Sequence, residues 1–207
     1  MIFEGPGADP RPAVQAMDDW LTDLDHLQKI LDDGGLGDLT NIERVAYLQA
    51  VERGRNKLAV LDHAIIADCV AHDLPGEQGQ SSMTRVWTQA LRISAGEASR
   101  RVQAAEQVGE RVSMLGQPMD PIRPVLAAAQ RAGEVTPEQV HVIAKGLASV
   151  DRAGFDPADI SIGEQILTRA AMDVGPQDLK GLTDRVIDAI NPDGSRPIEE
   201  GGVNSSV

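Results

Sequence analysis

Four arginines near the middle of the chain have the side-chain chemistry to bind phosphate groups. Arg85, Arg92, Arg100 and Arg101 lie within seventeen residues that contain a single acid, Glu97. Guanidinium groups donate several N–H bonds in a planar fork, and phosphate contacts supply most of the non-specific affinity of proteins for DNA. These arginines are therefore the candidate DNA-binding residues. The alternative is that they only keep an exposed helix surface charged.

No other group of residues has a spacing that strongly suits metal binding or catalysis. Cys69 and His72 stand one helical turn apart, but the chain offers no second pair of ligands, so we interpret them as part of a helix face. The histidines are scattered, and no hydrolase, zinc-protease or nucleotide-binding motif occurs. We therefore expect no enzyme activity, catalytic residue, metal site, cofactor or small-molecule substrate.

Two helices that meet at a tight turn are expected to position the arginines. The first is predicted at residues 82–92. Ser94 is a typical N-cap for the second, with the Glu97 carboxylate reaching back to complete a capping box. Apolar residues at helical spacing extend the second helix to about residue 116. This arrangement has the proportions of a helix-turn-helix whose adjacent arginines, Arg100 and Arg101, face outward.

The same order of helix, tight turn and helix occurs three times between residues 82 and 190. Thr136 and Gly175 are the predicted N-caps of the second and third units, and each precedes a proline, which is favoured at the first helical position. Successive caps lie 42 and 39 residues apart. Residues 82–190 are therefore predicted to form a bundle of three helix-turn-helix-like units.

Two helix starts within this bundle depend on aspartate–proline pairs. Asp120-Pro121 is predicted to begin one helix, with the aspartate as N-cap. Either Asp156-Pro157 or Ser161 begins another. No segment has the alternating pattern of a β-strand, so none is predicted.

The first part of the chain is expected to form an acidic helical hairpin at residues 13–73, after a disordered lead-in at residues 1–12. Thr40 and Glu43 form a predicted capping box at the start of its long second helix. Along that helix, apolar residues follow alternating steps of three and four, as in a coiled coil. This seam is expected to pack within the hairpin and, in part, to hold a homodimer together. Its members are Tyr47, Val51, Gly54, Leu58, Leu61, Ile65, Cys69 and His72.

Two further segments have the composition of irregular chain. Residues 74–81 are rich in glycine and glutamine and are predicted to link the hairpin to the bundle. Residues 191–207 begin with a strong turn signal and are predicted to be a disordered tail. The predicted fold class is therefore all-α, with a long antiparallel hairpin followed by a bundle.

Composition and charge narrow the functional classes further. The formal net charge is −13 over 207 residues, and residues 1–80 alone contain 15 acids and 6 bases. This balance argues against a chain that simply coats nucleic acid. No apolar run approaches the roughly 20 residues that span a bilayer, so no membrane association is expected. One cysteine and an N-terminus without a signal peptide predict a cytoplasmic location.

Three motifs, in this order, resemble the actinobacterial 13E12 repeat family, domain of unknown function 222. They are Leu-Arg-Ile-Ser-x-x-Glu-Ala-x-x-Arg-Val-x-x-Ala at 91–105, Ala-Gln-Arg-Ala-Gly-Glu-Val-Thr-Pro-Glu-Gln-Val at 129–140, and Ile-Asn-Pro-Asp-Gly at 190–194. The resemblance covers roughly residues 15–194. In that family the helical region usually precedes a His-Asn-His endonuclease module, and the genes occur in repeated copies like those of mobile elements.

The resemblance implies a link to DNA but assigns no catalytic residue to the helical region. The metal-binding cysteine pairs and the His-His pair of the nuclease module are absent, because Cys69 is the only cysteine and no histidine follows His141. The implied function is a non-catalytic module that binds or positions DNA for a His-Asn-His endonuclease-type protein. The alternative is a helical protein–protein interaction or dimerisation module with no nucleic-acid role.

Overall fold

The computed structural model of the chain describes residues 12–113 and 115–191. These residues form nine helices and one short two-stranded ribbon, which confirms the all-α class. The chain divides into two compact units, Met1–Ala50 and Val51–Val207, here called the N-terminal and C-terminal units. The boundary falls inside a helix. Apart from their inner ends, the predicted lead-in and tail lie outside the described residues.

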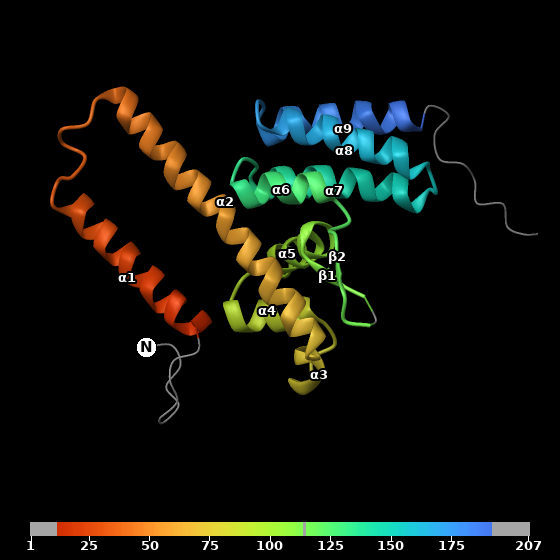
Figure 1. Ribbon diagram of the computed structural model, residues 1–207, viewed down its shortest axis with the longest axis horizontal. Coiled ribbons are helices and arrows are strands. Elements are labelled where there is room, and N and C mark those ends of the chain that lie inside the picture. The colour runs from red at the N-terminus through yellow and green to blue at the C-terminus, as the bar shows by residue number, and fades with distance from the viewer. Residues whose placement is uncertain (1–11, 114, 192–207) are drawn as a thin grey trace, which may run out of the picture. The chain divides into compact units, whose positions relative to one another are not determined.

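The N-terminal unit consists of α1 (Pro12–Asp32), a connector and the first turns of α2 (Asn41–Ala71) (Figure 1). Thr40 and Glu43 form the predicted capping box: the Thr40 N–H donates to Glu43 Oε2 at 2.7 Å, and the Glu43 N–H donates to Thr40 Oγ1 at 3.3 Å. None of the described residues up to Ala50 is buried. The packing of a hairpin therefore stays a prediction.

The C-terminal unit contains the rest of α2 and all later elements. Residues 74–81, where a linker was predicted, include a short helix that packs against the next one. The elements that follow α2 are α3 (Leu74–Glu77), α4 (Met83–Leu91), α5 (Ala95–Val108), β1 (Arg111–Val112), β2 (Pro118–Met119), α6 (Pro124–Ala132), α7 (Pro137–Arg152), α8 (Pro157–Ala171) and α9 (Pro176–Ile190).

The main hydrophobic core lies among α6, α7, α8 and α9, which pack against one another (Figure 1). Thr136 caps α7 in a complete capping box with Gln139, Asp156 rather than Ser161 caps α8, and Gly175 precedes α9. Each of these helices begins with proline. The largest fully buried apolar side chains of this core are Leu126, Ile143, Leu147, Leu167 and Leu179.

A second, smaller cluster joins α2 to α4 and α5. Its buried members are Ile66, Met83, Val86, Trp87, Ala98 and Ala105. α4 ends at Leu91, its C-cap Arg92 has a left-handed backbone conformation (φ 56°), and α5 begins at Ala95. The helix–turn–helix order predicted for residues 82–105 is therefore present.

Two predictions about the region after α5 are wrong. α5 ends at Val108 rather than near residue 116, and Val112 lies in a strand instead of on the helix. β1 and β2 pair antiparallel, with Arg111 opposite Met119 and Val112 opposite Pro118, although no strand was predicted. Both strands have two residues, too few for an alternating pattern to be visible in the sequence.

The start of α6 also differs from the prediction. The helix begins at Pro124, and its N-cap is Arg123 instead of Asp120. Arg123 offers no acceptor to the first N–H groups of the helix. The buried Glu164 of α8 accepts them instead, from Val125 at 2.8 Å and from Leu126 at 2.9 Å. A cap supplied from another helix replaces the local one.

Candidate functional site

The four candidate arginines lie on α4, the turn after it and α5. Arg85 is exposed on α4, Arg92 is the C-cap that follows that helix, and Arg100 and Arg101 lie in the second turn of α5. The turn is fixed by Ser94, whose Oγ accepts the Glu97 N–H at 3.1 Å. The sequence thus brings the arginines onto two neighbouring elements.

Glu97 binds two of the arginines and does not complete the predicted capping box. Its Oε1 accepts from Arg101 Nε at 2.8 Å, and its Oε2 accepts from Arg100 Nη2 at 2.6 Å. These hydrogen bonds, first from Arg101 and then from Arg100, lower the pKa of Glu97. In these two bonds both the donor and the acceptor are charged, whereas the backbone N–H of Ser94 is neutral, so the carboxylate binds the arginines.

Arg101 points toward α2 and α4, which corrects the prediction that it faces outward. Its Nη1 donates to Asp62 Oδ2 of α2 at 3.1 Å, and its guanidinium carbon lies 6.0 Å from the ring centre of Trp87. Burial raises the pKa of Asp62, and the nearby Arg101 opposes that rise. The position of Arg101 therefore fits a structural role, in which it connects three helices of the C-terminal unit.

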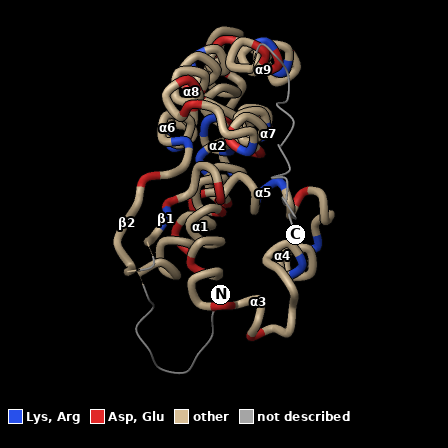
Figure 2. The backbone as a smooth tube through the Cα atoms, turned by 90° about the vertical axis from the view of Figure 1, so that its right-hand side faces the viewer, with Lys and Arg blue, Asp and Glu red and all other residues tan. Residues whose placement is uncertain are grey.

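Arg85 and Arg92 remain exposed, and neither joins an ion pair within residues 12–113 and 115–191. Residues 51–191 contain 19 acids and 15 bases, and Figure 2 shows the two signs interspersed along the backbone of this unit. The arginine cluster is therefore reduced to two unpaired bases, with Arg100 tied to Glu97. Two unpaired arginines can neutralise only a few phosphate groups, so the expected non-specific affinity for DNA is low.

α2 has two distinct faces within the C-terminal unit. One face is buried and contains Asn56, His63 and Ile66. The opposite face contains the predicted seam, and we call its four large members, Val51, Leu58, Leu61 and Ile65, the outer face of α2. These side chains are 38%, 37%, 46% and 47% exposed, respectively.

The buried face of α2 meets the turn between α6 and α7. Asn56 Nδ2 donates to the backbone carbonyl oxygen of Gly133 at 3.1 Å. Gly133 has a left-handed backbone (φ 81°), and a Cβ atom there would lie 2.6 Å from Arg53 Cγ. The family-like motif at 129–140 therefore has a structural explanation, because only glycine allows this close approach.

His63 is a buried titratable residue that belongs to none of the predicted motifs. Burial lowers its pKa to about 4, so the imidazole is neutral near pH 7. It follows Asn56 by seven residues and precedes Ile66 by three, which is the spacing of one helix face. The spacing of Asn56, His63 and Ile66 is therefore the sequence pattern from which the burial of His63 could be predicted.

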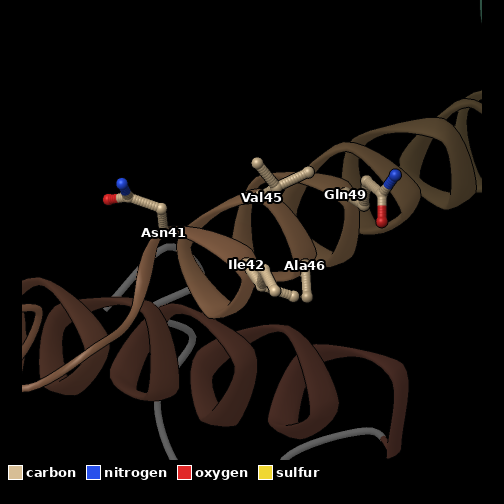
Figure 3. A pocket seen from close by; sticks show the side chains of 5 residues that line it. All are labelled: Asn41, Ile42, Val45, Ala46 and Gln49. Carbon is tan, nitrogen blue, oxygen red and sulfur yellow. The ribbon is translucent and has the colours of Figure 1, made fainter.

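The N-terminal unit has a shallow hollow at the start of α2 (Figure 3). Its volume is about 430 Å³, and its lining comes from successive turns of one helix: Asn41, Ile42, Val45, Ala46 and Gln49. Ile42 is 83% exposed. An open apolar surface of this kind suits a macromolecular contact better than a small molecule, which needs enclosure.

Metal-binding and membrane-spanning features do not occur in the part of the chain that the structure describes. Within it, no three side chains of His, Cys, Asp or Glu lie together so that they could hold a metal ion. None of its helices combines the length and apolar character needed to cross a membrane.

Comparisons with known proteins place the chain in a family. The family model of the domain of unknown function DUF222 matches residues 45–202, which include the described C-terminal unit and leave α1 outside. An uncharacterized protein of Mycobacterium tuberculosis H37Rv is 33% identical over 183 residues, which are 88% of this chain and 39% of that protein. An uncharacterized protein of Mycobacterium bovis is 33% identical over 161 residues, 76% of this chain and 34% of its own length.

The chain thus spans about a third to two fifths of the length of the curated relatives it matches. No solved structure matches it significantly. The relatives are uncharacterized, and the comparisons indicate no catalytic activity. The extent of the family match, from residue 45 to residue 202, shows that this chain belongs to the DUF222 family.

Proposed function

We propose that this chain is a non-catalytic helical module whose outer face of α2 binds another protein helix. The observation that carries the proposal is the exposure of Val51, Leu58, Leu61 and Ile65 in one row, opposite the face of α2 that the C-terminal unit buries. Contiguous apolar patches are unfavourable in water, and in folded proteins they usually mark contact surfaces.

The spacing of this row favours a helix as the partner. Apolar side chains at alternating steps of three and four fit into the gaps between side chains of a second helix. A small molecule would find no enclosed cavity on such a face. The resemblance to a family linked with mobile DNA is compatible with such a role. A module that pairs two helices would bring together two copies of any domain attached to it, such as a His-Asn-His endonuclease module.

Paired aspartate substitutions on the outer face test the proposal. Leu58→Asp with Leu61→Asp should leave the free energy of unfolding within about 1 kcal/mol of wild type at low protein concentration, because both side chains are partly exposed and neither belongs to a buried cluster. Ile66→Asp, on the buried face of the same helix, is the matched control and should unfold the unit. A loss of about 3 kcal/mol or more in the double variant would mean that the chain itself covers this face.

A second candidate function is DNA binding through the exposed arginines. Arg85, Arg92 and Arg100 lie on consecutive elements, and the first two have no acidic partner among the described residues. A labelled duplex titrated at two salt concentrations tests this function. Arg85→Ala with Arg92→Ala should reduce the log–log salt slope by about 0.9 for each phosphate that is no longer bound. Arg101→Ala should change stability instead, and absence of wild-type binding at low salt excludes this function.

A further inference from the structure

We infer that the helix bound by the outer face of α2 is α2 of a second copy of this chain, paired antiparallel across a twofold axis. This inference rests on the proposed function and names its partner. Three features of α2 within the C-terminal unit carry it: the spacing of the apolar row, the small residue inside the row, and the distribution of charge along the helix.

The apolar row has the heptad spacing of a two-helix coiled coil. Val51, Leu58 and Ile65 are seven residues apart, and Leu61 falls between the last two. The stretch from residue 51 to the end of α2 is about 30 Å long at 1.5 Å per residue, enough for several layers of side chains. In such a pair, each apolar side chain of the row inserts into a gap between four side chains of the facing helix.

Gly54 lies in the same row, between Val51 and Leu58. Nothing lies within 4 Å of the position that a Cβ atom would occupy there. The backbone of α2 is therefore open to close approach at this point. In an antiparallel coiled coil with this heptad, Leu58 packs against the partner's Leu61, and Gly54 faces the bulky Ile65. A small residue opposite a large one fills the layer evenly.

Charge selects the antiparallel orientation. The first half of this stretch, residues 51–60, contains Arg53, Arg55 and Lys57 against the single acid Glu52. The second half, residues 61–71, contains two acids and no lysine or arginine. Asp62 already binds Arg101 of α5, so the exposed Asp68 is the acid left for a partner helix. Parallel pairing would place like halves together, whereas antiparallel pairing places each basic half beside an acidic half. A self-complementary surface of this kind produces a closed twofold dimer.

The single cysteine provides a direct test of orientation in the wild-type chain. Cys69 lies near the acidic end of the row, so in an antiparallel pair the two copies of Cys69 are about 30 Å apart along the helices. Spin labels on Cys69 should therefore give a long dipolar distance in the dimer. A distance near that of adjacent helices, about 10 Å, would mean parallel pairing and would overturn the inference.

Cross-linking provides a matched pair of variants. Cys69→Ser with Leu58→Cys moves the only thiol close to the predicted twofold axis, so a short bismaleimide should join two copies. The same reagent should not join wild-type copies through Cys69. The reverse result would overturn the antiparallel arrangement.

A charge variant tests the source of the affinity. Arg55→Glu with Lys57→Glu makes both halves acidic and should weaken the dimer by about tenfold or more in sedimentation equilibrium. Lys180→Glu with Arg185→Glu changes the net charge equally at exposed positions on α9 and should leave association nearly unchanged. Equal effects of both pairs would overturn the charge argument.

The result for self-association separates this inference from the proposed function. If wild type stays monomeric at high concentration while Leu58→Asp with Leu61→Asp leaves stability unchanged, the second copy is wrong as the partner but the open interaction face remains. If that double variant loses stability at low concentration, the face is covered within the chain, and both fail.

Discussion

Both units of this chain contain helices with exposed or buried apolar side chains at helical spacing, but among the described residues only the C-terminal unit buries such side chains fully. Leu126, Leu147 and Leu167 are fully buried there. In the N-terminal unit, Leu27 and Ile42 remain exposed, and no described residue is buried. Apolar periodicity therefore predicts a helix and the direction of its apolar face, but not what covers that face.

Charge separates the units in the same way. The described residues 12–50 contain eight acids and two bases, whereas residues 51–191 contain 19 acids and 15 bases. The family match begins at residue 45, close to the boundary between the units. The C-terminal unit therefore contains the described helices that the family shares, and the acidic α1 lies outside the match.

The largest expected difference between the units comes from removing a leucine side chain. Leu126→Ala should lower the free energy of unfolding by about 2–5 kcal/mol, because it leaves a cavity in the main core. Leu27→Ala in α1 should cost no more than about 0.5 kcal/mol, because the side chain is exposed. Urea unfolding measures both. The tryptophans provide separate reporters, since Trp20 lies in the N-terminal unit and Trp87 in the C-terminal unit. A similar cost for both substitutions would mean that α1 has a core of its own.

The local parts of the fold could be predicted from sequence. Ser94, Thr40 and Thr136 stand at helix starts, because a cap depends on residues within one turn of it. Prolines at the first helical position mark the starts of α7 and α9 for the same reason.

The non-local parts could not be predicted in this way. The start of α6 depends on Glu164, 38 residues later in the chain, and the direction of Arg101 depends on Asp62, 39 residues earlier. The candidate DNA site has fewer free arginines than the composition predicts, because Glu97 binds Arg100 and Arg101, and Asp62 also binds Arg101. α2 also has two faces with different roles. The apolar seam that its sequence predicts is exposed, whereas the buried face contains Asn56, His63 and Ile66, of which two are polar and give no apolar pattern.

The second expected effect concerns the glycine that lets α2 approach α6. Gly133→Ala should cost about 2–4 kcal/mol, because it adds a left-handed backbone penalty to a clash with Arg53. Gly154→Ala in the same unit has the same left-handed conformation (φ 76°) and open space around it, so it should cost only about 1–2 kcal/mol. Gly34→Ala in the N-terminal unit also places alanine in a left-handed conformation (φ 88°) with open space around it, and should cost about as much as Gly154→Ala. Thermal unfolding compares the three, and equal costs for Gly133 and Gly154 would contradict the close approach.

The third prediction is that acid destabilises the C-terminal unit through His63. The unfolded chain binds a proton at this imidazole near its ordinary pKa of 6.5, whereas the folded chain binds it only near pH 4. Stability from His63 is therefore complete above pH 6.5 and falls as the pH approaches 4, by up to about 3 kcal/mol. Urea unfolding at pH 7 and pH 4, followed by Trp87 fluorescence in a Trp20→Phe background, measures this loss.

The variant His63→Gln isolates the contribution of the imidazole. Asp62 and Glu164 titrate in the opposite sense, because burial raises their pKa values and their protonation favours the folded chain as the pH falls. Comparing the two pH profiles removes these shared contributions. His63→Gln should lose less stability than wild type between pH 6.5 and pH 4. Identical profiles would show that His63 is not buried as described.

The smallest expected effect compares two helix caps, one in each unit. Ser94→Ala removes the acceptor for the Glu97 N–H at the start of α5, whose Ala98 is completely buried. We expect a loss of about 0.5–2 kcal/mol in the unfolding of the C-terminal unit, seen by Trp87 fluorescence. Thr40→Ala removes an equivalent acceptor and breaks the box with Glu43. It should instead lower the helical circular dichroism signal slightly, because α2 frays at an end that no core holds.

Hydrogen exchange distinguishes the two outcomes residue by residue. Thr40→Ala should speed exchange only in the first turns of α2, before residue 51, and leave the Trp87 transition unchanged. Ser94→Ala should speed exchange throughout α4 and α5, because these helices share the cluster around Trp87 and unfold together. If Thr40→Ala shifts the Trp87 transition as much as Ser94→Ala does, the two units unfold as one. The division at residues 50 and 51 would then have no thermodynamic meaning.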